Sequence, residues 1–230
     1  MRVARAVKRV ADPLLPQGAA PRTIPFGPLR GLRMEIDLSS QARLYFGVFE
    51  IELVRWFREF CGRGSSSFDG GAREGYLSLL LARLSAGGRV LAVEADHAAF
   101  ELLRRNVALN PSLARAPEPR LARITGRTSG ELDVTLDDLA FADEGFVPDL
   151  VKLDVEGWEL RALEGGERLL AEHRPHLVVE THSEDHERGC AELLLRQGYA
   201  PKVVEPRRWL PEVREGHNRW LVAEGRPRAV

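Results

Sequence analysis

Acidic and glycine residues that could bind a small molecule lie between two apolar segments near residue 70. The turn between these segments carries Gly70, Gly71 and Gly75. Asp69 precedes the turn, and Tyr76 opens a helical pattern after it. Glycines let the backbone turn sharply and approach a ligand closely, and a helix start offers free N–H groups to an anionic group. The turn lacks the lysine of a phosphate-binding NTPase loop, so the sequence predicts a different cofactor.

A second acidic residue narrows the choice of cofactor. Glu94 follows Gly75 by about twenty positions, where a carboxylate can accept hydrogen bonds from a ribose diol. This arrangement serves dinucleotide enzymes and S-adenosylmethionine enzymes alike. Asp69 favours the second class, because a negative charge beside a pyrophosphate costs energy, whereas it suits the ammonium and sulfonium end of S-adenosylmethionine. An NAD-dependent oxidoreductase is the alternative, although the chain lacks a Tyr-x-x-x-Lys pair.

The elements that must position these residues alternate between strands and helices. Apolar segments predict strands at 65–68, 89–95, 149–155, 176–182, 201–205 and 219–224. Helical patterns lie between them at 96–110, 157–173 and 186–199. Such alternation predicts an α/β fold with a mostly parallel sheet and helices on both faces. Ligands should then bind beyond the carboxyl ends of the strands, and the last two strands should form an antiparallel pair.

The start of the chain differs from the rest. Valines and basic residues in 2–10 indicate a short amphipathic surface helix, and five prolines in 11–30 indicate an extended segment. Residues 32–38 alternate like an exposed strand, and 45–60 carry apolar residues at the spacing of one amphipathic helix. We therefore expect an N-terminal lead-in over residues 1–43, followed by one catalytic domain over 44–230.

Side chains that could take part in a reaction follow the third and fourth apolar strands. Asp154 should lie where the ligand crevice opens, in contact with cofactor or acceptor, and Glu156 could contact the following helix or the site. His182 is the candidate base, because its free pKa lies near neutrality, and His186 competes with it in the same loop. The expected catalytic residues are therefore Asp154, His182 and Glu156.

Two further features of these strands concern charge. Lys152 is expected to be a buried ion-pair partner of a neighbouring acid. Asp154, Glu156, Glu180 and His182 could together bind a metal. No ligand spacing in the sequence requires one, so no metal is expected.

Longer motifs resemble a known family. The stretches "FDGGAREGYLSLLLARL", "GRVLAVEAD", "VTLDDL", "PDLVKLDVEGWELRALEGGERLL" and "RPHLVVETH" are similar to the FkbM-type S-adenosylmethionine-dependent methyltransferases. The resemblance implies a Rossmann-like class I fold with a seven-stranded, mostly parallel sheet and an antiparallel C-terminal strand. It also implies O-methylation of a sugar or natural-product hydroxyl. The expected cofactor-binding residues are Asp69, Gly70, Gly71, Ala72, Gly75, Glu94, Ala95 and Asp154.

The sequence departs from the family pattern at a few positions. The family has a branched apolar residue where Gly70 stands and an asparagine where Arg73 stands, and its first strand is more apolar than 65–68. A degenerate homologue that binds the cofactor without turnover is therefore a further alternative.

The composition limits the partners. The chain has 230 residues and a formal net charge of -1, which gives no case for a nucleic-acid binder. No apolar run approaches a membrane span. The two cysteines, Cys61 and Cys190, favour a reducing cytoplasm over a disulfide framework. We expect a cytoplasmic protein that acts on a small-molecule acceptor, with a homodimer as a possible assembly.

Overall fold

A seven-stranded sheet forms the centre of the protein in the computed structural model, which describes residues 18–142, 146–207 and 217–225. Its strand order is β10-β11-β9-β8-β3-β4-β5. The strands are β3 (Ser67–Gly70), β4 (Val90–Glu94), β5 (Glu118–Leu121), β8 (Leu150–Leu153), β9 (His176–Thr181), β10 (Lys202–Val204) and β11 (Arg219–Ala223). All pairs are parallel except those of β11 with β9 and β10. The predicted fold class, with its antiparallel C-terminal strand, is therefore confirmed.

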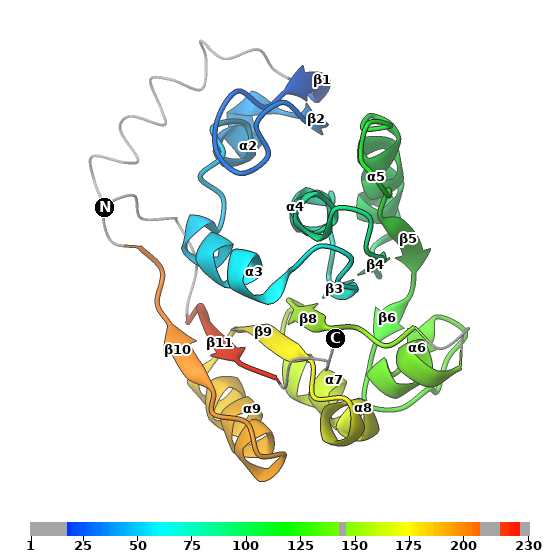
Figure 1. The fold of residues 1–230 in the computed structure, drawn as a ribbon, viewed down its shortest axis with the longest axis vertical. Helices are drawn as coiled ribbons and strands as arrows, with labels where there is room; N and C mark the ends of the chain where they lie inside the picture. The colour runs from blue at the N-terminus through cyan, green and yellow to red at the C-terminus, as the bar shows by residue number, and fades with distance from the viewer. Residues whose placement is uncertain (1–17, 143–145, 208–216, 226–230) are drawn as a thin grey trace.

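Helices cover both faces of this sheet (Figure 1). They are α4 (Tyr76–Ser85), α5 (His97–Ala108), α6 (Leu136–Phe141), α7 (Glu159–Glu164), α8 (Glu167–Glu172) and α9 (Glu184–Arg196). Helix α4 packs on one face, where Leu79 meets Val90 and Leu150 in one apolar cluster. Helices α6 to α9 pack on the other, around Phe68 and Val151. The central strands are buried on both faces, which explains their nearly continuous apolar sequences.

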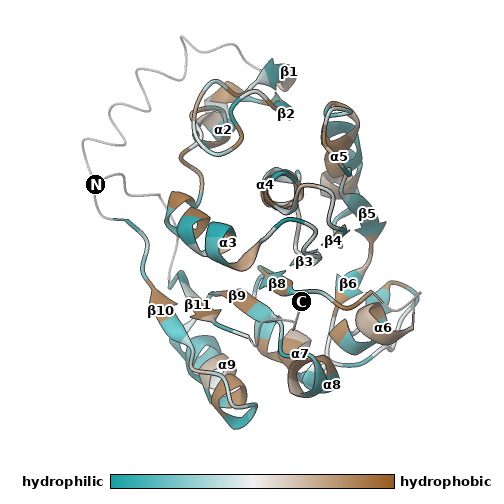
Figure 2. Cartoon of the chain, viewed as in Figure 1, coloured by the Kyte–Doolittle hydropathy of each residue, from teal (hydrophilic) through white to brown (hydrophobic). Residues whose placement is uncertain are grey.

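Local signals set the boundaries of the two longest helices. Asp96 caps α5, because its side chain accepts a hydrogen bond from the Ala99 N–H at 2.8 Å. Ser183 caps α9 in the same way through the His186 N–H. The chain leaves α9 at Gly198, whose φ of 78° suits glycine. Helix α9 carries both teal and brown residues in Figure 2, as expected of a helix with one face against the sheet.

The N-terminal region forms its own two-stranded sheet, and its apolar side chains share one core with α4 and the main sheet. Strands β1 (Ala20–Thr23) and β2 (Arg33–Ile36) pair antiparallel with each other. The predicted single helix over 45–60 is wrong, because the chain forms α2 (Leu38–Tyr45), a short 3-10 turn η2 (Ile51–Leu53) and α3 (Val54–Phe60). Gly47 and Glu50 adopt positive φ between α2 and η2, and the Gly47 backbone lies directly against the backbone of 26–27. That contact prevents a continuous helix.

Two shorter strands lie beyond β5. Strands β6 (Arg123–Ile124) and β7 (Asp133–Val134) form a small parallel pair. The predictions missed β5, because its sequence contains Pro119 and charged residues; it lies at an edge of the sheet, where proline is tolerated. None of the described helices is both long enough and apolar enough to cross a bilayer. The helix expected over 2–10 lies outside the described residues.

Candidate functional site

Two adjoining cavities open where β3, β4, β8 and β9 end. The apolar cavity, of about 380 Å³, is lined by Val93, Glu94, Ala95, Asp96, Ala122, Arg123, Ile124, Val155 and Trp158. The acidic cavity, of about 360 Å³, is lined by Ser40, Gln41, Arg43, Phe49, Glu50, Ala72, Glu74, Tyr76, Leu77, Lys152, Glu180, His182 and Asn218. Both cavities also share Gly71, Arg73, Asp154 and Glu156. A ligand could therefore extend from one into the other past these residues.

The glycine turn is tied to the neighbouring strand at the junction of the cavities. The backbone N–H groups of Gly71 and Ala72 both donate to the Val93 carbonyl, at 2.9 and 3.0 Å. Gly71 has a φ of 71°, and a Cβ there would overlap the Asp154 carbonyl oxygen. Only glycine lets the two loops approach so closely.

The packing around β3 also explains one departure from the family pattern. A Cβ at Gly70 would lie 2.6 Å from Ile124 Cδ1 and 2.9 Å from Leu153 Cδ2. The side chains of neighbouring strands therefore fill the space that a branched residue would occupy. Glycine at position 70 therefore fits this core, because it adds no side chain to the filled space.

Glu94 lies at the edge of the apolar cavity with its carboxylate held by backbone groups. It accepts hydrogen bonds from the N–H groups of Arg73 at 2.7 Å, Ala95 at 2.9 Å and Asp96 at 2.8 Å. The side chain is 7% exposed. A carboxylate fixed in this way at a strand end keeps lone pairs available for the hydroxyls of a ligand.

Asp69 lies beneath the glycine turn and lines neither cavity. Its fully buried carboxylate accepts a hydrogen bond from Ser78 Oγ and pairs with Lys152 Nζ at 3.1 Å. Lys152 also donates to the Gly71 carbonyl at 3.0 Å. Burial lowers the pKa of Lys152, but the carboxylates of Asp69 and Asp154 outweigh this and raise it, so the ammonium stays charged. The expected pairing of Lys152 is present.

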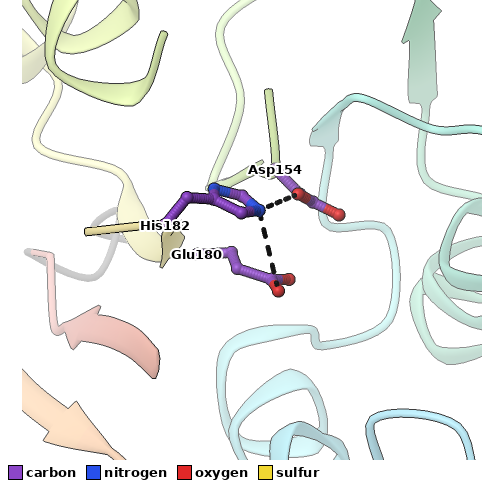
Figure 3. Close-up of side chains that lie close together, drawn as sticks. All are labelled: Asp154, Glu180 and His182. Atoms are coloured by element: carbon purple, nitrogen blue, oxygen red, sulfur yellow. Dashed lines mark ion pairs between the residues drawn. The ribbon is translucent and has the colours of Figure 1, made fainter. Parts of the chain in front are cut away.

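Three side chains converge on the acidic cavity from the ends of β8 and β9 (Figure 3). His182 Nε2 lies 3.5 Å from Asp154 Oδ1 and 4.0 Å from Glu180 Oε1. The other ring nitrogen of His182, Nδ1, lies 2.7 Å from Glu159 Oε1. Glu159 is fully buried and also accepts the Gly157 N–H at 2.9 Å. The structure thus brings together Asp154 and His182, both expected from the sequence.

The contact between Glu159 and His182 changes the acidity of both groups. Burial raises the pKa of Glu159, but hydrogen bonds from His182 and the Gly157 N–H outweigh this and lower it. The hydrogen bond to Glu159 raises the pKa of His182 above its usual 6.5, against the opposing effect of burial. An ionised Glu159 fixes the proton of neutral His182 on Nδ1, which leaves the Nε2 lone pair facing the cavity.

Glu156 takes a different position from the one expected of a catalytic group. Its carboxylate pairs with Arg73 at 2.8 Å, and both side chains are mostly exposed. Both residues also have positive φ, 46° and 49°. The pair joins the loop after β3 to the loop after β8, where the two cavities meet.

Two further residues of the site, Glu159 and Trp158, had no predicted role. Glu159 lies within the stretch "PDLVKLDVEGWELRALEGGERLL", 23 positions before His182, and this separation in the sequence hides their contact. Trp158, 50% exposed, lines the apolar cavity. Both residues directly follow the motif at the end of the 149–155 strand. That position, next to a predicted site, is the signal that could have identified them.

Comparison with known proteins gives one match to a family model. Residues 132–215 match the model of the Methyltransferase FkbM domain. The resemblance to the FkbM-type methyltransferases is confirmed. The matched stretch contains Asp154, Glu159 and His182. No curated protein sequence matches the chain.

Solved structures share the fold. Methyltransferase FkbM from Methylobacillus flagellatus is 17% identical, with a TM-score of 0.53, over 75% of this chain and 51% of that one, so this chain spans about half of that protein. The M. jannaschii TYW2 protein, solved with AdoMet, is 18% identical, with a TM-score of 0.59, over 90% and 85%. A SAM-dependent O-methyltransferase from Thermotoga maritima is 15% identical, with a TM-score of 0.53, over 78% and 67%.

Proposed function

We propose that the chain transfers the methyl group of S-adenosylmethionine to a hydroxyl oxygen of a small-molecule acceptor, such as a sugar or a natural product. The main support for this proposal is that an apolar cavity and an acidic cavity adjoin each other at Gly71 and Asp154. One offers apolar walls and a fixed carboxylate, and the other offers Nε2 of His182, held from its far side by Glu159. This is the arrangement that a nucleoside cofactor beside a proton-bearing acceptor requires.

The apolar cavity suits the adenosine half of the cofactor. Glu94, held by three backbone N–H groups, would accept hydrogen bonds from the ribose hydroxyls. Ile124 and Trp158 offer apolar surface for the adenine ring. The methionine half would pass Gly71 towards Asp154, whose carboxylate suits its positive charge. Asp69 supports this path from below through Lys152 and the Gly71 carbonyl.

The acidic cavity suits a neutral, hydroxyl-rich acceptor. Carboxylates of Glu50, Glu74 and Glu180 line it and could accept hydrogen bonds from hydroxyls, whereas they would repel an anionic acceptor. The net charge of -1 likewise favours a small molecule over a nucleic acid. We propose a cytoplasmic setting for this reaction.

The reaction itself needs position and removal of a proton. The acceptor oxygen attacks the methyl carbon, the O–CH3 bond forms as the S–CH3 bond breaks, and the hydroxyl proton leaves. Positioning can supply about 7–11 kcal/mol of the barrier, and activation of the hydroxyl typically about 10²–10⁴-fold. His182 Nε2, aimed by Glu159 and placed beside Asp154, is the group that we assign to this activation.

Two measurements test the proposal in sequence. Calorimetric titration with S-adenosylhomocysteine should show one binding site. Glu94→Gln should weaken the affinity of that site. Glu101→Gln, a change on the exposed face of α5, should leave the affinity unchanged. Formation of S-adenosylhomocysteine should then be followed with a panel of sugar and polyketide hydroxyls. Absence of calorimetric binding at high micromolar ligand contradicts the cofactor. Binding without turnover on any hydroxyl, but with turnover on another acceptor class, contradicts the O-methylation.

A further inference from the structure

Three ligand-type atoms meet at one point of the acidic cavity. Asp154 Oδ1, Glu180 Oε1 and His182 Nε2 all lie within 4.8 Å of one another. Figure 3 shows the three side chains pointing toward the same space from the ends of two neighbouring strands. We propose that they bind a divalent transition-metal ion of the Mn²⁺ type. The site itself stands on these contacts alone, whereas its role in activating the acceptor rests on the proposed function.

The distances fit a shared ion better than direct hydrogen bonds. His182 Nε2 is 3.5 Å from Asp154 Oδ1 and 4.0 Å from Glu180 Oε1, both too long for a hydrogen bond. Nitrogen and oxygen ligands lie at about 2.0–2.2 Å from an ion such as Zn²⁺, so ligand atoms on one ion are themselves about 3 Å or more apart. A small movement of these side chains would close the set around one ion.

Contacts outside the cluster fix two of its three members. Glu159, fully buried, holds His182 through Nδ1 and so presents the Nε2 lone pair to the cluster. Glu180 is 4% exposed and accepts a hydrogen bond from Trp220 Nε1 at 3.1 Å and another from Asn218 Nδ2. Metal-bound histidines and carboxylates characteristically have such outer partners, which orient the ligand and raise its basicity.

Two basic side chains that line this cavity have partners outside the cluster. Lys152 Nζ pairs with Asp69 and donates to the Gly71 carbonyl, beneath the turn. Arg73 pairs with Glu156 at the junction of the cavities.

The ligand set also indicates the type of ion. One imidazole with two carboxylates suits ions such as Mn²⁺ or Zn²⁺, whereas Mg²⁺ and Ca²⁺ prefer ligand sets made only of oxygen. The cluster lines the acidic cavity, so part of the ion's coordination shell would face the acceptor. On coordination, an acceptor hydroxyl would lose its proton to water, and its oxygen would then attack the methyl carbon with S-adenosylhomocysteine as the leaving thioether. With the ion bound, His182 Nε2 is a ligand, and the ion takes over the activation of the hydroxyl that we assign to His182 in the metal-free protein.

The test uses Mn²⁺ alone with the chelator-treated full-length protein and no cofactor. Loss of the free-ion electron paramagnetic resonance signal should report one bound Mn²⁺ per chain. Asp154→Asn and His182→Ala should each weaken binding at least tenfold, and Glu159→Gln, outside the cluster, by about 10–100-fold. Glu156→Gln removes the same charge from the same cavity without touching the cluster, and it should retain wild-type affinity. Circular dichroism confirms that each variant folds.

Two results would overturn the inference. One is an undiminished free-ion signal up to millimolar Mn²⁺. The other is equal weakening by Glu156→Gln and Asp154→Asn, which would mean that Mn²⁺ responds only to the overall charge of the cavity. Because the titration needs no cofactor, S-adenosylhomocysteine calorimetry on the same samples tells separately whether the methyltransferase proposal fails.

Discussion

The two cavities are built by different means. Around the apolar cavity, backbone groups make the main hydrogen bonds. Glu94 accepts hydrogen bonds from three backbone N–H groups, and the Gly71 N–H donates to the Val93 carbonyl. Around the acidic cavity charged side chains are matched in pairs, such as Lys152 with Asp69 and His182 with Glu159. The shape of the apolar cavity therefore depends on backbone geometry, and the arrangement of the acidic cavity depends on the pairing of charges. Substitutions should act through backbone geometry in one and through ionisation in the other.

The largest effect is expected where a buried charge loses its partner in the acidic cavity. Lys152→Met leaves Asp69 buried and unpaired, which should cost about 3–5 kcal/mol of unfolding free energy. The double variant Asp69→Asn with Lys152→Met should recover much of that loss. Urea unfolding measures both. Lys202→Met, which removes an exposed pair with Glu224, is the matched control, with an expected cost of about 1 kcal/mol or less. Equal costs at the two lysines would contradict charge balance as the organising feature.

The next effect tests the backbone of the junction. Gly71→Ala forces a Cβ against the Asp154 carbonyl in a left-handed conformation that itself costs about 1–2 kcal/mol. We expect a lower melting temperature and loss of S-adenosylhomocysteine binding by calorimetry. Gly64→Ala separates the two causes, because Gly64 has a φ of 80° with no atom near its Cβ position. If both variants bind the cofactor product equally well, the close approach of the loops does not shape the site.

A smaller effect concerns the ionisation of His182. In chelator-treated protein its imidazole should titrate above 6.5, and Glu159→Gln should move that pKa down, because the hydrogen bond that raises it is lost. By linkage, the pair adds stability that is fully present below about pH 6.5 and fades as the pH rises through the folded pKa of His182. Nuclear magnetic resonance titration of the histidine signals measures the shift. Glu164→Gln, on the exposed side of α7, should leave it in place. An unmoved His182 titration in Glu159→Gln would show that Glu159 does not orient the ring.

The smallest effect is expected at the boundary between the cavities. Arg73 and Glu156 form an exposed pair, so Arg73→Ala and Glu156→Ala should show a coupling energy below about 1 kcal/mol in a double-mutant cycle of stability. The coupling should decrease further in high salt. A coupling of several kcal/mol would mean that this pair holds the two loops together, and the division between backbone and charge would then need revision.

The sequence predicted some residues of each cavity, and the residues that it missed have a physical reason. Gly71 and Glu94 belong to adjacent segments whose turn and strand-end positions can be read from local pattern alone. His182 and Glu159 lie on separate segments, and their contact depends on the packing of α7 against α9. Sequence reasoning placed His182 at the site but gave its buried partner no role.

The N-terminal region shows the same limit. The apolar spacing over 45–60 fits one helix, but the turn with positive φ at Gly47 and Glu50, packed against 26–27, divides it. Strand β5 was missed, because its sequence "EPRL" carries no apolar pattern and its place is fixed by pairing with β4. Local pattern therefore predicts elements whose partners are nearby, and tertiary contacts decide the rest.

A crystal structure with bound S-adenosylhomocysteine tests the central claim most directly. We predict the ribose hydroxyls on the Glu94 carboxylate, the adenine between Ile124 and Trp158, and the sulfur near Gly71 and Asp154 with its open side towards His182. The account would be contradicted by a ligand whose adenosine half lies in the acidic cavity, or whose sulfur is separated from His182 by the Arg73–Glu156 pair.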